Sequence, residues 1–158
     1  IFAKHTENNR QPVTDRVTQL SQLERQAGLD QLQTYQQFSE QVRQTKRHIL
    51  NFLIQAKQAG KTIVGYGAPA KGNTLLNYCG IRSDFISYTV DRSPHKQGLF
   101  LPGTHIAVYP PEKIQETQPD YLVILPWNLK DEIVTQMAVI RAWGGKFVTL
   151  IPQVEIIL

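Results

Sequence analysis

Two closely spaced glycines follow a short apolar run near the middle of the 158-residue chain. Gly65 and Gly67 open a G-x-G-x-x-A pattern that ends at Ala70. In such a pattern the second glycine lets the backbone approach a phosphate, and the small final residue lets the next helix pack close to the strand. A helix that begins there also offers N–H groups and a partial positive charge. Taken alone, these residues favour a dinucleotide site.

Three features depart from an ordinary dinucleotide motif. Pro69 removes an N–H from the loop itself. The residues that follow include Lys71, Gly72 and Asn73, where a dinucleotide-binding helix would carry apolar side chains. Lys71 could place a point charge on a phosphate. The loop at residues 91–98 is longer and more cationic than a ribose clamp. The pattern is not a P-loop either, because no G-x-x-x-x-G-K-[ST] is present.

Further candidate contacts lie outside the glycine turn. Asp91 ends a predicted strand, about where a ribose-binding acid is expected, and Lys96 follows in the next loop. His105 lies in a short predicted strand, and Trp127 could stack on a base or a sugar. Each has a structural alternative: the glycines could only shape a turn, Asp91 could stabilise a loop, Lys96 could be solvated, and both rings could simply pack. The predicted substrate-binding residues are Gly65, Gly67, Ala68, Pro69, Ala70, Lys71, Gly72, Asn73, Asp91, Lys96, His105 and Trp127.

Catalysis and metal binding find no support in the spacing of reactive side chains. No Ser/His/Asp or Cys/His set and no close carboxylate pair can be assembled. Cys79 is the single cysteine, which excludes an internal disulfide and a cysteine-based zinc site and makes a cytoplasmic location the default expectation. A net charge of +4 without a dense basic stripe predicts no nucleic-acid partner. No apolar stretch approaches the roughly 20 residues of a membrane helix, so we expect no membrane partner.

Alternating strands and helices must position the glycine turn. Apolar runs predict strands at 62–66, 85–90, 104–108, 120–125 and 146–151, with helices at 69–78, 110–117 and 129–143. Such alternation predicts an α/β domain whose mainly parallel sheet is covered on both faces. We expect a Rossmann-like, doubly wound, five-stranded sheet of order 3-2-1-4-5 over residues 60–158, with the ligand beside the first strand.

A long helical arm is predicted at residues 14–59, before this domain. Apolar residues recur there at spacings of three and four, and Gly28 predicts the end of a first short helix. The second helix should run for about 30 residues and lay its apolar stripe on the following domain, another domain or a second copy of the chain. Residues 1–13 are interpreted as the tail and linker of a preceding domain, because residues 1–5 have the pattern of a strand and no initiator Met precedes them.

Four segments together resemble the C-terminal domain of SAM-dependent sugar C-methyltransferases. They are residues 65–77, 91–98, 101–106 and 121–128. The match covers about residues 14–158. Enzymes of this family methylate a carbon of a nucleotide-linked deoxysugar, often a dTDP-4-keto sugar. They combine a cysteine-rich zinc-binding region, a central SAM-binding domain with the catalytic His and Tyr residues, and a Rossmann-like C-terminal domain.

The resemblance implies that this chain helps to hold a nucleotide-linked sugar, a dTDP-sugar being expected, without itself catalysing methyl transfer. It implies no cofactor in this chain, with SAM and zinc held by domains outside this sequence and the SAM-binding domain as a partner. A pyrophosphate suits the glycine turn, the helix N-terminus and Lys71. Two alternatives stay open: an NAD(P)-binding oxidoreductase domain, and a structural or assembly module whose glycine turn holds no ligand.

Overall fold

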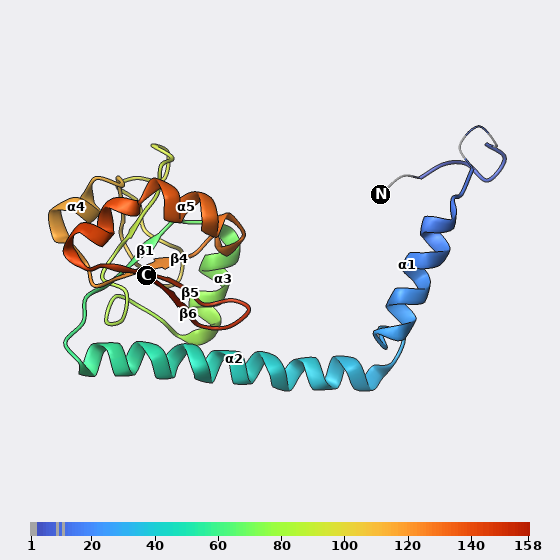
Figure 1. Cartoon of the computed structure of the whole chain (residues 1–158), viewed down its shortest axis with the longest axis horizontal. Helices are drawn as coiled ribbons and strands as arrows, with labels where there is room; N and C mark the ends of the chain where they lie inside the picture. Colours follow the sequence, from blue (N-terminus) through green and yellow to red (C-terminus); the bar gives the residue numbers. More distant parts are fainter. Residues whose placement is uncertain (1–2, 9, 11) are drawn as a thin grey trace. The chain divides into compact units, whose positions relative to one another are not determined.

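The computed structural model describes residues 3–8, 10 and 12–158 (Figure 1). The chain divides into two compact units, Ile1–Val42 and Arg43–Leu158.

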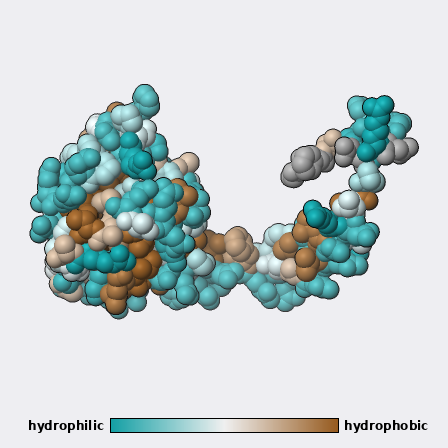
Figure 2. Space-filling model, turned by 45° about the horizontal axis from the view of Figure 1, so that its top comes forward, coloured by the Kyte–Doolittle hydropathy of each residue, from teal (hydrophilic) through white to brown (hydrophobic). Residues whose placement is uncertain are grey.

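The first unit is helical. Helix α1, Asp15–Gln26, ends just before Gly28, whose φ of 70° is the left-handed conformation expected at such an end. Helix α2, Leu32–Gln58, begins in this unit and continues into the second. The predicted strand at residues 1–5 lies partly outside the described residues, and residues 3–5 form no strand. Exposed apolar side chains gather on these helices, where Figure 2 shows brown surface. They include Val17, Leu20, Leu23, Leu32, Tyr35 and Phe38.

The second unit contains a six-stranded sheet of order β3-β2-β1-β4-β5-β6. The strands are β1 (Ile63–Tyr66), β2 (Thr89–Val90), β3 (Val108–Tyr109), β4 (Tyr121–Ile124), β5 (Lys146–Thr149) and β6 (Glu155–Ile157). Strands β1 to β5 are parallel, which confirms the predicted order 3-2-1-4-5. The prediction of five strands is wrong, because β6 adds an antiparallel edge to β5. This strand is too short and too close to Pro152 to show a strand pattern in the sequence.

Helices lie on both sides of the sheet (Figure 1). They are α3 (Ala70–Cys79), α4 (Lys113–Thr117), the 3-10 turn η1 (Trp127–Leu129), α5 (Lys130–Gln136) and the 3-10 helix η2 (Ala138–Trp143). The single helix predicted at 129–143 is therefore interrupted, because Met137 leaves the helical conformation at φ −103° and ψ 19°. Two predicted strands, 85–90 and 104–108, shrink to the two residues each of β2 and β3.

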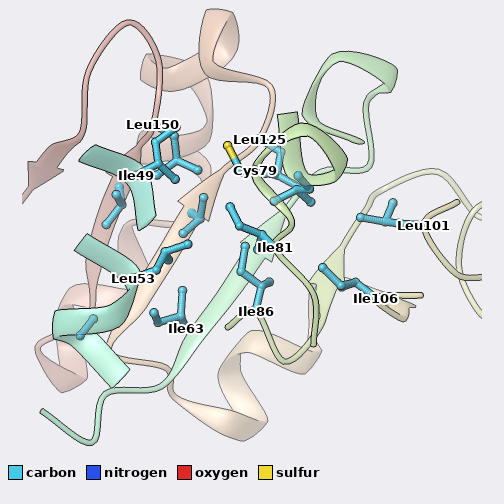
Figure 3. Packing of buried hydrophobic residues seen from close by; sticks show 14 of the residues in the cluster. Ile49, Leu53, Ile63, Cys79, Ile81, Ile86, Leu101, Ile106, Leu125 and Leu150 are labelled. Carbon is cyan, nitrogen blue, oxygen red and sulfur yellow. The ribbon is translucent and has the colours of Figure 1, made fainter. Parts of the chain in front are cut away.

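Separate hydrophobic clusters pack on the two faces of the sheet. One joins Ile49 and Leu53 of α2 with Ile63 of β1 and residues of α3, and Figure 3 shows this packing. The other joins β1 and β4 with Ile114 of α4 and Ile133 of α5. Neighbouring residues of a strand point to opposite faces, so a strand covered on both sides is apolar throughout. In the part of the chain that the structure describes, no helix combines the length and apolarity needed to span a bilayer.

Candidate functional site

The glycine turn, residues 67–69, connects β1 to α3 at the carboxyl edge of the sheet. Gly67 has a φ of 89°, and a Cβ atom on it would lie 2.7 Å from Cδ of Pro126. Its N–H donates to the carbonyl of Val90 at 2.6 Å, and the Thr89 hydroxyl donates to its carbonyl at 2.8 Å. Both the backbone conformation and the lack of space therefore require glycine at this position.

Gly65 and Gly72 also lie where a side chain would have no space, whereas Ala70 does not make the close contact expected of it. A Cβ atom on Gly65 would lie 2.7 Å from Oγ1 of Thr89, so β1 and β2 need glycine there. A Cβ atom on Gly72 would lie 2.8 Å from Cβ of Leu125. Close packing of α3 on the end of β4 thus depends on Gly72, whereas Ala70 is exposed. The expectation that Ala70 provides this close packing is wrong, and Ala70 lies at the first turn of α3.

The N-terminus of α3 offers hydrogen-bond donors at the ligand edge of the sheet. The first N–H to bond within the helix is that of Asn73, which donates to the carbonyl of Pro69 at 3.0 Å. The N–H groups of Ala70, Lys71 and Gly72 precede it and therefore have no acceptor inside the helix. They also lie at the positive end of the helix dipole. This arrangement suits an anion such as a phosphate group.

Asp91 and Lys96 lie at the glycine turn, and their hydrogen bonds stabilise it. Oδ2 of Asp91 accepts a hydrogen bond from the N–H of Ala68 at 2.7 Å and another from Nζ of Lys96 at 3.1 Å. Its Oδ1 accepts from the N–H of Ser93 at 2.8 Å. Nζ of Lys96 also donates to the carbonyl of Ala68 at 3.1 Å. The loop after β2 is thereby joined to the turn after β1.

The pKa of Asp91 follows from these contacts. Burial of the carboxyl group, whose side chain is 13% exposed, acts to raise its pKa. Hydrogen bonds from Ser93, Ala68 and Lys96 outweigh burial and hold the pKa below its ordinary value. Asp91 is therefore ionised at neutral pH and already engaged, which favours the loop-stabilising alternative; contact with a ribose stays a prediction.

Lys71 lies beside the residues that follow β4. Its Nζ is 4.5 Å from the ring centroid of Trp127 and donates a hydrogen bond to Oδ1 of Asn128. A cation over an indole ring gains about 0.5–1 kcal/mol at an exposed site. Trp127 is thus brought to the first turn of α3, as its predicted place at the ligand edge required. Asn73, in the same turn of α3, has a buried Oδ1 atom for which no hydrogen-bond partner exists among the described residues.

His105 is the one predicted site residue that the structure separates from the glycine turn. It is exposed, has a φ of 56° and borders neither of the cavities described below. Its loop is held by hydrogen bonds from Asn77 to the carbonyl of Pro102 at 3.0 Å and from Arg82 to the carbonyl of Gly103 at 2.7 Å. The strand predicted around His105 is wrong, because a turn occupies residues 102–104.

Two neighbouring cavities border the loop after β2, and the smaller of them also borders the glycine turn. The smaller, of about 270 Å³, is lined by the turn itself, by Asp91 and Lys96, and by residues of α5. The larger, of about 600 Å³, extends to Pro110 and the start of α4. Both share Tyr66, Arg92 and Gln136.

Sequence reasoning missed the polar residues of these cavities. Glu132 and Gln136 are four residues apart on α5 and their side chains are hydrogen-bonded at 2.7 Å. That spacing places two residues on one face of a helix, so a helix following β4 could have indicated them. Arg92 could have been indicated by its place directly after Asp91. Tyr66 has no such signal in the sequence and is recognised only by its burial in the structure. That burial also raises the pKa of its hydroxyl.

The described residues around the glycine turn present hydrogen-bond donors and cations. Among them, no group of three or more His, Cys, Asp or Glu side chains lies close enough to hold a metal ion. Cys79 is buried, and burial raises the pKa of its thiol, which makes it a poor nucleophile. The arrangement can bind and orient an anionic ligand.

Comparisons with known proteins show the family to which the chain is similar. The family described as the C-methyltransferase C-terminal domain matches residues 1–152. C-methyltransferase NovU of Streptomyces niveus is 34% identical over 134 residues, which are 85% of this chain and 32% of that protein. The chain thus spans about a third of the length of this curated relative. Among solved structures, UDP-D-quinovosamine 4-dehydrogenase of Vibrio fischeri aligns with a TM-score of 0.42 and 18% identity, over 59% of this chain and 79% of that one.

Proposed function

The chain belongs to the C-methyltransferase C-terminal domain family, and we propose that it holds a nucleotide-linked deoxysugar for a SAM-dependent C-methyltransferase. In this proposal the pyrophosphate lies at the glycine turn and the first turn of α3. The chain supplies binding and orientation, and the bond-forming chemistry takes place in another part of the enzyme.

The observation that carries the proposal is the open N-terminus of α3 beside a cationic side chain. The N–H groups of Ala70, Lys71 and Gly72 lie outside the helical hydrogen-bond ladder. Lys71 adds a full positive charge at the same turn. Lys96 borders the adjacent cavity, where one of its hydrogen bonds goes to Asp91. A diphosphate is the natural anion for such a turn, because it accepts several N–H bonds and carries more than one charge.

The residues of this chain would act by positioning. The N–H donors at α3 would hold the pyrophosphate in place, which would restrict the rotational freedom of the rest of the ligand. Holding a reactant in one geometry converts a bimolecular encounter into an effectively unimolecular step. SAM, bound by another domain, would supply the methyl group. Zinc also remains an expectation for other domains of the enzyme.

A nicotinamide dinucleotide is the competing ligand for a G-x-G-x-x-A turn. Its ribose normally requires a free carboxylate after the second strand. Asp91 occupies that place, but its oxygens accept hydrogen bonds from Ala68, Lys96 and Ser93. This engagement favours the nucleotide-linked sugar over NAD(P).

Calorimetric titration of the chain with dTDP, a dTDP-sugar and NAD tests the proposal. We expect the two dTDP ligands to bind and Lys71→Ala to weaken their binding by about 5- to 30-fold, since one hydrogen bond to a charged group contributes about 1–2 kcal/mol at an open site. The matched control is Lys57→Ala, at the last turn of α2, which should leave both affinities unchanged. Tight binding of NAD without binding of dTDP would refute the proposal.

A further inference from the structure

The smaller cavity beside the glycine turn has the size and lining of a site for a flat ring. Its volume of about 270 Å³ lies just below the roughly 300–1,000 Å³ of typical ligand pockets. It therefore suits one end of a nucleotide-linked sugar rather than the whole ligand. Its apolar lining includes Pro126, Leu129 and Ile133, together with the backbone of the glycine turn. Such a lining favours the faces of a ring over a hydroxyl-rich sugar, whose polar groups would lose hydrogen bonds.

A network of polar side chains borders the same cavity. Oε1 of Glu132 accepts a hydrogen bond from Nε2 of Gln136 at 2.7 Å and lies 4.0 Å from Nη1 of Arg92. The Tyr66 hydroxyl donates to Oε1 of Gln136 at 3.4 Å, which turns the amide NH₂ towards Glu132. The side chains of Arg92 and Glu132 are 67% and 56% exposed, so a ligand can reach them.

These three side chains present a donor, an acceptor and a donor in succession. Arg92 can only donate, the Glu132 carboxylate can only accept, and the NH₂ group of Gln136 has a second hydrogen to donate. The imide edge of uracil or thymine has the complementary pattern: a carbonyl oxygen, the ring N–H and a second carbonyl oxygen. Cytosine presents a ring lone pair and an amino group instead, so it would set a lone pair against Glu132.

We propose that this cavity is a nucleobase subsite in which Arg92, Glu132 and Gln136 recognise the imide edge of a uracil or thymine ring. The inference rests on the proposed function, because it takes the pyrophosphate to lie at α3. In that function the sugar carbon must meet a methyl group held by another domain. The sugar end therefore extends away from this chain, and the nucleoside end occupies the cavity next to the turn.

Calorimetric titration of the whole chain with UDP, dTDP, CDP and inorganic pyrophosphate tests the subsite. We expect UDP and dTDP to bind at least about tenfold more tightly than CDP, since a hydrogen bond to a charged group contributes about 1.5–3 kcal/mol. Glu132→Gln should reduce this ratio to below about threefold, because an amide can turn either to accept or to donate. Asp131→Asn, on the same turn of α5 but outside both cavities, is the matched control and should keep the full ratio.

The outcomes separate the subsite from the function on which it rests. Equal affinity for UDP, dTDP and CDP, with no change in Glu132→Gln, would overturn the nucleobase assignment and leave pyrophosphate binding at α3 intact. Failure of the unsubstituted chain to bind pyrophosphate and every diphosphate would overturn both. Circular dichroism of Glu132→Gln, expected to match that of the unsubstituted chain, shows that a changed ratio reflects recognition and not unfolding.

Discussion

The side chain of Asp91 lies at the carboxyl end of β1, and that of Asp120 lies at the opposite end. Asp91 joins the glycine turn to the loop after β2, so it shapes the site whether or not it also contacts a ligand. Oδ2 of Asp120 accepts from the N–H and the hydroxyl of Thr62, each at 2.9 Å, and its Oδ1 accepts from Nζ of Lys61 at 2.9 Å. It therefore joins the start of β1 to the start of β4.

The Asp120 contacts predict how stability changes with pH. The N–H of Thr62 and the Lys61 ammonium lower the pKa of Asp120 from 3.8 to about 2. A carboxyl group whose pKa is lower in the folded chain stabilises the fold above its unfolded pKa, and this stabilisation disappears as the pH falls through the folded pKa. The free energy of unfolding should thus decrease between about pH 4 and pH 2. Chemical denaturation at several pH values should show that the free energy of unfolding decreases less between about pH 4 and pH 2 in Asp120→Asn than in the control Asp84→Asn. An equal decrease in the two variants would contradict this role of Asp120.

At the scale of elements, the strand-turn-helix unit around Gly67 is the most constrained part of the site. Gly67→Ala should destabilise the chain through both its φ of 89° and the contact with Pro126. Gly60→Ala is the matched control, because Gly60 has a φ of 72° with no atom within 4 Å of an added Cβ. The strain common to both should cost about 1–2 kcal/mol, and the clash should add about 1–3 kcal/mol for Gly67 alone. Urea unfolding measures the loss of stability in both variants. Equal losses in Gly67→Ala and Gly60→Ala would show that the turn can move away from Pro126.

Helix α2 contains residues in two different environments. Leu53 is 0% exposed in the core on one face of the sheet, whereas Phe38 is 60% exposed. Leu53→Ala should lower the free energy of unfolding by about 2–5 kcal/mol, because it leaves a cavity in that core. Phe38→Ala should change it by less than about 0.5 kcal/mol. Urea unfolding of both variants checks this, and a large loss in Phe38→Ala would show that the exposed stripe is covered in solution.

At the scale of the whole molecule, the alternation of apolar strands with helices was sufficient to predict the parallel order and the place of the glycine turn. Contacts between residues that are far apart in the sequence were not predictable. Gly72 replaces Ala70 as the close contact because the end of β4 lies over it. The engagement of Asp91 depends on where the N–H of Ala68 comes to lie, and Arg92 meets Glu132 only after folding. Strand β6 was missed because three residues show too little of a period-two pattern.

The central claim is that the turn after β1 binds the pyrophosphate of a nucleotide-linked sugar. Backbone amide NMR spectra of the chain, recorded while dTDP is added, test it most directly, because the bound phosphates would lie against N–H groups. We expect the amide signals of Gly67, Ala70, Lys71 and Gly72 to shift progressively and saturate, while that of His105, in a loop outside the site, does not move. Saturating shifts confined to the loop around His105, or no shift at the turn while dTDP binds elsewhere, would contradict it.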